Sequence, residues 1–323
     1  MTPDRHALGL DIGGTRISAA VVSHRGEAKA LAREATPRQE GAHVVLDRVT
    51  RLAEAVILQS EGLELEGIGI GFGGPVDHHA GRIRTSHHVF GWADIDVLAA
   101  LSERFGLPCY LENDANAGGL GEALFGAAQG RASLLYVNIG TGVGGAIVIE
   151  GRIHRGANSN AGELGHVVLD PHGPPCTCGK RGCVEALCSG DAIGAMARNA
   201  DLSGSALAKL PTEDLSGREV GKRAAAGDSI AREIIGRSAS FMGLALAGAA
   251  NLLDPEVIVL GGGVSQLGPV YLEPCREAFR AHAMHIPAQH TKILPAQLGY
   301  DAGVIGAAAV ALTKQQAPSI SPG

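Results

Sequence analysis

The sequence has 323 residues, a length that suggests two domains rather than one simple core. Its net charge is −6 and its 27 Lys and Arg residues form no basic run, which argues against a nucleic-acid-binding protein. We find no signal sequence, no helix-turn-helix segment before the first apolar strand and no apolar run of membrane-spanning length, so we expect a cytoplasmic protein without membrane contacts.

Two pairs of similar segments organise the chain. Residues 8–22 and 134–151 each have the pattern of a strand, a glycine-rich turn and a second strand. Residues 67–77 and 256–265 are each an apolar strand that runs into a glycine-rich loop. These echoes indicate one α/β unit that is used twice.

Stretches with helical spacing of apolar residues lie between these strands. They cover residues 44–60, 113–128, 230–253 and 303–316. Strands and helices mixed in this way predict sheets covered by helices, and hence an α/β fold. The last residues, 317–323, are rich in turn-forming types, and we expect them to be disordered.

The first glycine turn has the composition of a phosphate-binding loop. In the segment DIGGT, Gly13 and Gly14 let the backbone pass close to an anion, and the Thr15 hydroxyl is a further donor. Asp11 at the start of this segment is suited to hold Mg²⁺, because magnesium in proteins uses one or two carboxylates together with the phosphates and several water molecules.

The second hairpin supplies a matching turn at Gly140, Thr141 and Gly142. Two such turns suit a triphosphate, although each alone is also compatible with an ordinary tight hairpin. The glycines here match the pattern G-x-G-x-x-G, but a dinucleotide-binding motif requires a helix next, and the following residues AIVIEG have a strand pattern. No G-x-x-x-x-G-K-[ST] motif of a P-loop kinase occurs. A third glycine run suits a flat adenosine group against bare backbone and consists of Gly261, Gly262 and Gly263.

Asp114 follows a strand and begins a helical stretch. Phosphoryl transfer needs a carboxylate that accepts the proton of the attacking hydroxyl group, and we expect Asp114 to be that base. The alternative is that Asp114 only caps the helix, a common role for Asp at this position.

Three cysteines and one histidine form a candidate metal site. Cys176, Cys178 and Cys183 have the spacing C-x-C-x4-C in a turn rich in Gly and Pro, and His166 lies upstream. Three thiolates and one imidazole suit tetrahedral Zn²⁺ in a closed, structural site. Coincidence or a redox pair of cysteines is the alternative. Such a site would hold Glu163, His166 and Glu185 near one another, where they suit sugar hydroxyl groups.

Together, these motifs resemble one family. DIGGT, GGPVD, ENDANAGGLGEALFGA, IGTGVGGA, AGELGH, CTCGKRGCVEA, VIVLGGGVS and DAGVIGAA occur in the order seen in the ROK family (repressors, open reading frames, sugar kinases) of the hexokinase/actin-like ATPase superfamily. The resemblance runs from about residue 7 to about residue 312, and its most specific parts are the Glu-Leu-Gly-His segment and the cysteine motif.

The resemblance implies two ribonuclease-H-like domains with a hinge cleft between them. The small domain would comprise residues 1–114 and be completed by a C-terminal helix at about 301–316, and the large domain would comprise 115–300 with a zinc-binding loop at 166–185. The family also implies a homodimer.

The same resemblance implies the roles of the site residues. Asp114 resembles the catalytic base, and the DIGGT and IGTGVGG loops resemble the ATP phosphate sites. His166 would use one ring nitrogen for zinc and the other for the sugar. The residues that resemble sugar-hydroxyl ligands are Asn113, Glu163, His166 and Glu185.

Two departures from the family pattern fall near the expected sugar site. His88 takes the place of a sugar-contacting Asn, and Ser159 stands where the family often has Gly. Both changes would reshape the pocket wall and affect the choice of sugar, whereas the apparent catalytic set is unchanged. For His88 the alternative is that its loop has shifted and the side chain faces solvent.

The predicted function is phosphorylation by Mg-ATP of the primary hydroxyl of a hexose or N-acyl hexosamine, with Asp114 as general base and Zn²⁺ as a structural ion. Two other classes stay open. A catalytically silent sugar-sensing regulator would use the same pocket, although no DNA-binding segment precedes the first strand. An actin-like structural protein that binds ATP would not require the zinc motif.

Overall fold

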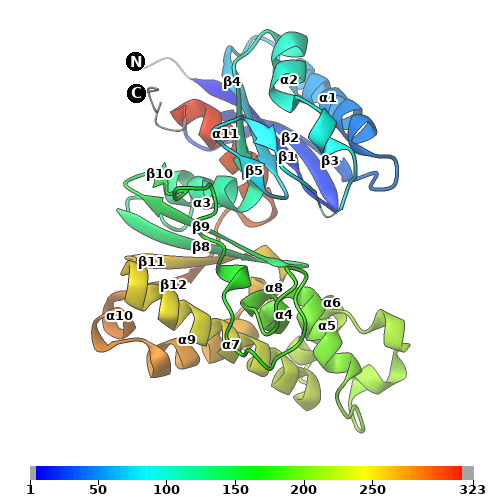
Figure 1. The fold of residues 1–323 in the computed structure, drawn as a ribbon, viewed down its shortest axis with the longest axis vertical. Coiled ribbons are helices and arrows are strands. Elements are labelled where there is room, and N and C mark those ends of the chain that lie inside the picture. Colours follow the sequence, from blue (N-terminus) through cyan, green and yellow to red (C-terminus); the bar gives the residue numbers. More distant parts are fainter. Residues whose placement is uncertain (1–4, 87, 315–323) are drawn as a thin grey trace. The chain divides into compact units, whose positions relative to one another are not determined.

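Each half of the chain contains a five-stranded sheet of the same plan. The computed structural model describes residues 5–86 and 88–314, which divide into two units (Figure 1). The first unit comprises residues 1–132, 146–161 and 297–323, and the second comprises 133–145 and 162–296. The first unit therefore extends past Asp114, beyond the limit that the sequence suggested for the small domain.

The first sheet has the strand order β3-β2-β1-β4-β7. Its first three strands are antiparallel neighbours, whereas β4 and β7 run parallel to β1. The hairpin of β1 and β2 is formed by the segment predicted at residues 8–22. The strands are β1 (His6–Ile12), β2 (Arg16–Ser23), β3 (Ala28–Ala35), β4 (Leu65–Phe72) and β7 (Cys109–Asn113). The short strands β5 (Val76–Asp77) and β6 (Arg82–Ile83) pair separately.

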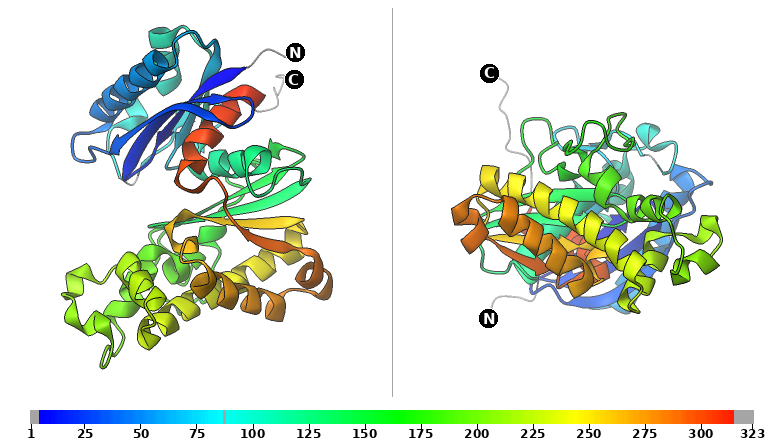
Figure 2. Two further views of the ribbon diagram at one scale, coloured as in Figure 1. Left: turned by 180° about the vertical axis from the view of Figure 1, so that it is seen from behind. Right: turned by 90° about the horizontal axis from the view of Figure 1, so that it is seen from below.

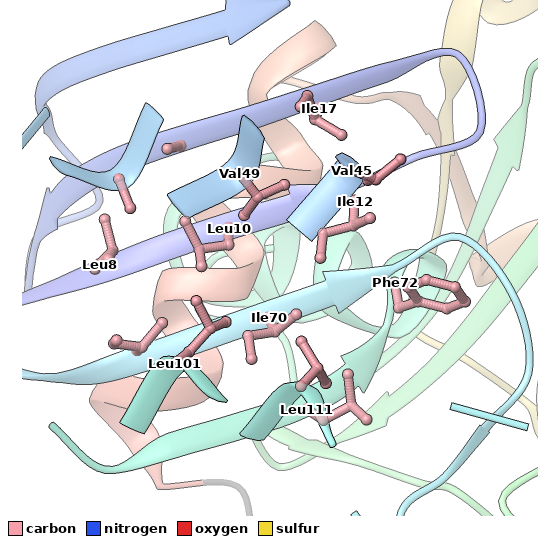
Figure 3. Close-up of a cluster of buried hydrophobic side chains, with 14 of the residues drawn as sticks. Leu8, Leu10, Ile12, Ile17, Val45, Val49, Ile70, Phe72, Leu101 and Leu111 are labelled. Carbon is pink, nitrogen blue, oxygen red and sulfur yellow. The ribbon is translucent and has the colours of Figure 1, made fainter. Parts of the chain in front are cut away.

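A buried apolar cluster joins one face of this sheet to α1 (Ala42–Gln59) and α2 (Val97–Phe105). Figure 3 shows Leu10, Ile70 and Leu111 of the strands facing Val49 of α1 and Leu101 of α2. Alternate strand residues and every third or fourth helical residue point into this layer, as their periodicities require. The cluster fixes β1, which carries Asp11, and the end of β7, which Asp114 follows.

The other face of the first sheet is covered by α11 (Ala302–Thr313), which lies beside α3 (Asp114–Phe125) (Figure 2). Glycines let α11 approach the strands closely. A Cβ atom on Gly9 would lie 2.1 Å from the carbonyl oxygen of Val304, and one on Gly69 would lie 1.7 Å from that of Ala307. No side chain fits at either position without displacing the helix.

Replacing Gly69 with alanine is therefore expected to lower the free energy of unfolding by about 3 kcal/mol, because the helix must move away from a packed sheet. The matched control is Gly71→Ala on the same strand, where the nearest atoms to an added Cβ lie 3.5 Å away or more. This control should change stability by less than about 1 kcal/mol. Denaturant unfolding of both variants measures the difference, and equal losses would contradict the packing argument.

The second sheet repeats the plan of the first, with the order β10-β9-β8-β11-β12. Strands β11 and β12 run parallel to β8, and β10 is antiparallel to β9. The strands are β8 (Ser133–Ile139), β9 (Val143–Ile149), β10 (Arg152–Ile153), β11 (Val257–Gly261) and β12 (Lys292–Pro295). The repeated topology confirms the α/β prediction that was based on the two sequence echoes.

In the second unit, the long helix α7 (Ser229–Leu253) packs against α9 (Pro269–His282). The remaining helices of this unit are α4 (Val184–Cys188), α5 (Gly190–Arg198), α6 (Gly217–Ala225), α8 (Gly262–Ser265) and α10 (His285–His290). Each of the four helical stretches predicted from periodicity corresponds to a helix, namely α1, α3, α7 and α11.

Two further predictions concern local structure. A strand, β9, follows the Gly140–Gly142 turn, so the rejection of a dinucleotide-binding motif is confirmed. The predicted disorder of residues 317–323 concerns a segment outside the described residues. Among the described residues, no helix has the length and apolar character needed to span a bilayer.

Candidate active site and metal centre

The turn between β1 and β2 is held in shape by the loop that follows β3. The Gly13 amide donates to the carbonyl oxygen of Arg16 at 3.0 Å. The Thr36 hydroxyl donates to the carbonyl oxygen of Gly13 at 2.7 Å, and the Arg38 side chain donates to that of Gly14. The sequence alone does not indicate these two supporting residues, because they lie outside every motif and contact the turn only in the folded protein.

Asp11, at the end of β1, lies close enough to Asp114 for the two carboxylates to repel each other. Burial and, to a smaller extent, the Asp114 charge together raise the pKa of Asp11 to about 7, while Arg16 opposes the shift. The carboxylate also lies against α11, 2.9 Å from the position of a Cβ on Gly303. A divalent cation would offset this repulsion, and oxygen ligands suit Mg²⁺, so the site fits the predicted ion.

The raised pKa of Asp11 has a consequence for stability. The folded protein favours the protonated form of Asp11. Below about pH 4 this group therefore does not lower the free energy of unfolding, and between pH 4 and pH 7 it lowers that free energy progressively. Asp11→Asn should therefore stabilise the ligand-free protein at pH 8 by on the order of 2 kcal/mol and leave it unchanged at pH 4. Denaturant unfolding at both pH values tests this.

Asp77→Asn serves as the control of opposite sign. The Ala80 amide donates to Asp77 at 3.0 Å, and this bond lowers the pKa of Asp77. Removing that charge should lower the free energy of unfolding at pH 8 rather than raise it. A stabilisation by Asp11→Asn that is equal at pH 4 and pH 8 would contradict the assigned cause.

Asp114 is the first residue of α3, at the junction with β7. Asn113 caps the helix, because its side-chain oxygen accepts from the amides of Ala115 and Asn116 at 3.0 and 3.1 Å. One Asp114 oxygen accepts from the Ala115 amide at 2.9 Å, and the other lies 3.5 Å from the position of a Cβ on Gly73. The carboxylate is thus fixed at a helix N-terminus and directed toward the loop after β4.

The sequence left two roles open for this Asn-Asp pair. Asn113, rather than Asp114, is the residue that caps α3. The Asn113 amide nitrogen also donates to an Asp114 oxygen at 3.2 Å and to the carbonyl oxygen of Gly74 at 3.2 Å. The capping residue Asn113 therefore holds the Asp114 carboxylate in place, and this placement suits a positioned base.

His88 lies beside the first glycine turn. Its ring carbon Cδ2 is 2.3 Å from the position that a Cβ on Gly14 would take, so the imidazole packs directly on this glycine. The residue is exposed overall. Only a glycine leaves room for the ring, which places the family-divergent His88 next to the predicted phosphate loop.

The second glycine turn, between β8 and β9, is linked to Glu185 of α4. One Glu185 oxygen accepts from the Val143 amide at 3.1 Å, and a Cβ on Gly142 would lie 2.5 Å from the same oxygen. The other oxygen accepts from the Thr177 hydroxyl at 2.9 Å. Glu185 thus joins the turn to the cysteine loop. Its partner Thr177 lies within the cysteine motif, but the sequence alone did not predict this contact.

The four predicted zinc ligands come together in the second unit. One ligand atom from each of His166, Cys176, Cys178 and Cys183 lies within 4.8 Å of the others. The Cys178 and Cys183 sulfurs are 3.6 Å apart, and the Cys176 sulfur is 3.7 Å from His166 Nδ1. Zinc bonds of about 2.3 Å to sulfur give tetrahedral edges of about 3.8 Å, so the residues fit Zn²⁺.

The histidine of this cluster has its two nitrogens in different surroundings. Nδ1 faces the thiols, whereas Nε2 lies 4.0 Å from a carboxylate oxygen of the exposed Glu163. His166 sits in a short 3₁₀ helix, Leu164–His166, which sets this orientation. The arrangement leaves Nε2 on the same side as Glu163, as required if one nitrogen binds metal and the other a hydroxyl group.

The remaining predicted positions have simple settings. Gly261 ends β11, and Gly262, with a φ of 82°, starts α8, while a Cβ on Gly263 would meet nothing within 4 Å. The backbone is therefore open at Gly263, whereas a Cβ on Gly261 would lie 2.5 Å from the Tyr136 hydroxyl oxygen and one on Gly262 would lie 2.4 Å from the carbonyl oxygen of Ile139. Ser159 has a φ of 57°, the left-handed conformation that favours glycine. The backbone thus retains a glycine-like turn where the sequence departs from the family pattern.

The predicted site residues divide between the units. Those in the first unit are Asp11, Gly13, Gly14, Thr15, His88, Asn113 and Asp114. Those in the second unit are Gly140, Thr141, Gly142, Glu163, His166, Cys176, Cys178, Cys183, Glu185, Gly261, Gly262 and Gly263. Within each unit the motifs converge on strand ends and the loops that follow them, the edge at which open α/β sheets bind ligands.

Several known proteins are similar to this chain over almost its whole length. The pattern of the ROK family matches residues 7–314. The glucokinase of Halalkalibacterium halodurans is 37% identical over 99% of this chain and 98% of its own length. A ROK family glucokinase from Streptomyces griseus, solved in complex with glucose and AMPPNP, is 34% identical with a TM-score of 0.83, covering 95% of this chain and 99% of that one.

A third protein is similarly close over almost its whole length. The ROK hexokinase from Thermus thermophilus is 37% identical, with a TM-score of 0.82 over 96% of this chain and 98% of its own. The family pattern and the three enzymes, each matched over nearly its whole length, agree on one family. The chain belongs to the ROK family.

Proposed function

We propose that this chain is an ATP-dependent sugar kinase that phosphorylates the primary hydroxyl group of a hexose or an N-acyl hexosamine. The observation that carries the proposal is the placement of Asp114, a carboxylate fixed at the start of α3 and close to Asp11 at the first glycine turn. Full-length relatives named glucokinase support the reaction class. The N-acetylmannosamine kinase of Escherichia coli, 30% identical over 94% of this chain, supports the wider range of sugars.

In this mechanism Asp114 accepts the proton of the sugar's primary hydroxyl as its oxygen attacks the γ-phosphorus of ATP. Asn113, Glu163, His166 and Glu185 bind the other ring hydroxyls and orient the attacking one. The glycine turns at Gly13–Thr15 and Gly140–Gly142 bind the phosphates through backbone amides, which stabilises the charge that develops on them. The product is a sugar 6-phosphate.

Two ions belong to the proposal. Asp11 would hold Mg²⁺, which neutralises charge on the phosphates when bound. His166 and the three cysteines would hold Zn²⁺, which fixes the loop that carries Thr177 and so supports Glu185. By family resemblance we also propose a cytoplasmic homodimer.

His88 bears on the choice of sugar and of phosphoryl donor. Its imidazole packs on Gly14 within the first unit, beside the turn that we assign to the phosphates. We therefore assign the predicted sugar contact of His88 to the part of the sugar that receives the phosphoryl group.

The test is an assay of ADP release with Mg-ATP and a panel of glucose, mannose, fructose, allose, N-acetylglucosamine and N-acetylmannosamine. Zinc content is measured on the same sample. We expect turnover with one or a few of these sugars and a 6-phosphate product by NMR. Absence of turnover with every sugar, in protein that holds its zinc, would contradict the kinase and favour a sugar-sensing regulator. The matched proteins include a repressor, the xylose repressor of Bacillus subtilis, which is 29% identical over 77% of this chain.

A further inference from the structure

A buried ion pair contacts the segment that contains the residues assigned to catalysis. Glu112, in β7 next to Asn113, is 1% exposed. Its Oε2 atom accepts from Nε of Arg155 at 2.7 Å, and the second guanidinium nitrogen also lies at 2.7 Å. The Arg155 side chain is 11% exposed, so both charges are largely removed from water.

The other oxygen of Glu112 holds the catalytic segment. Its Oε1 atom accepts from the Asn113 amide at 3.0 Å and from the side-chain nitrogen of Asn116 at 2.9 Å. Asn116 belongs to the first turn of α3, which Asp114 begins. One carboxylate thus joins Arg155 to both sides of the junction between β7 and α3.

The third ionisable group in this cluster is His78, the residue after β5. Its ring is buried, and Nδ1 lies 3.8 Å from Glu112 Oε2, beyond hydrogen-bond distance. Burial and the nearby Arg155 charge lower the pKa of His78, so at neutral pH the imidazole is uncharged. The charge of Glu112 is therefore balanced by Arg155 and not by His78.

Arg155 also organises the loop in which it lies. Its carbonyl oxygen accepts from the Ala161 amide at 3.0 Å, which closes the turn that contains Ser159. Glu163, a proposed sugar ligand, follows this turn in the sequence. The ion pair consequently fixes both the end of β7 and the start of the segment that leads to the sugar-binding residues.

We infer that Arg155 and Glu112 are positioning residues for the phosphoryl transfer, which hold the Asn113–Asp114 junction in its reactive geometry through their buried charge pair. The inference rests on the kinase activity proposed above. Neither side chain is assigned a contact with substrate. Their effect is on the alignment of Asp114, and a displacement of about 1 Å in a reacting group can cost about 100-fold in rate.

The test is a double-mutant cycle with Arg155→Met, Glu112→Gln and the combined variant. Each single change leaves one buried charge without its partner, which is more disruptive than removal of both. We expect each single variant to lose about 10- to 100-fold in kcat per folded molecule, with KM for ATP within about threefold of the wild-type value. The combined variant should regain at least about threefold over the worse single variant.

Two further variants control for charge and location. Arg155→Lys keeps the charge, and its kcat should stay within about fivefold of wild type. Arg152→Met removes a cation from an exposed position of the same segment, in β10, and should leave kcat unchanged. If Arg155→Met does not fold, the comparison of Glu112→Gln with the combined variant still tests the coupling.

The outcomes separate this inference from the proposed function. Wild-type kcat in the folded single variants, with only a lower unfolding midpoint, would show a purely structural ion pair and overturn the inference alone. A combined variant no better than the worse single one would also overturn it. A wild-type protein inactive with every sugar overturns the kinase proposal and this inference together.

Discussion

Asp114→Asn is expected to lower kcat for sugar phosphorylation by about 10³-fold or more, because the amide cannot accept the proton of the attacking hydroxyl group. Sugar affinity should stay within about threefold of the wild-type value, since the side chain keeps its size and the ring-hydroxyl ligands remain. The helix start should also persist, because the amide oxygen can still accept from the Ala115 amide. Steady-state kinetics and calorimetric titration with the preferred sugar measure the two effects separately.

The matched control for this variant is Asp96→Asn. Asp96 also lies at the start of a helix and accepts from the Ala99 amide at 3.0 Å, but it is the N-cap residue of α2 and belongs to no proposed ligand set. Its replacement should leave kcat unchanged. Wild-type turnover in Asp114→Asn would remove Asp114 from the role of general base, whereas a parallel loss of sugar binding would assign it to the sugar instead.

Local sequence patterns predicted the parts of the fold that local physics controls. The four helical stretches have strong periodicity, and the two hairpins have glycine turns between apolar strands, so both types of element were found within a few residues of their limits. The proximity of the four proposed metal ligands was predictable for a similar reason. Three of its four ligands lie in one short loop, between Cys176 and Cys183, and their side chains meet without help from distant segments.

Contacts between distant segments carry the rest of the site, and no local pattern marks them. Thr36 and Arg38 hold the Gly13–Gly14 turn from another loop, and Arg155 reaches Glu112 from beyond β9. Each pair meets because the strand order of the sheet and the loops around it bring the partners together. The sequence also does not show the direction of a side chain, so the contact of His88 with Gly14 could be seen only in the structure.

Removal of the proposed zinc is expected to weaken sugar binding at least about tenfold and to lower the unfolding midpoint, because a structural metal site contributes folding free energy directly. Cys183→Ala is the variant of choice, since this cysteine is completely buried and contributes one of the four ligand atoms. Elemental analysis should show about one zinc ion per chain in the wild-type protein and close to none in the variant. The matched control is Cys109→Ala, which removes a partly buried thiol that lies outside the cluster.

The sugar effect follows from contacts within the second unit. His166 holds the cluster through Nδ1 and faces Glu163 with Nε2, so loss of the metal frees the ring that we assign to a sugar hydroxyl. Glu185 is held by Thr177 of the same loop and contacts the Val143 amide at the second glycine turn. Treatment with a chelator should therefore weaken the binding of the sugar, and zinc added back should restore it. Unchanged sugar affinity in metal-free, folded protein would show that the loop keeps its shape alone, and the metal would then have no part in substrate binding.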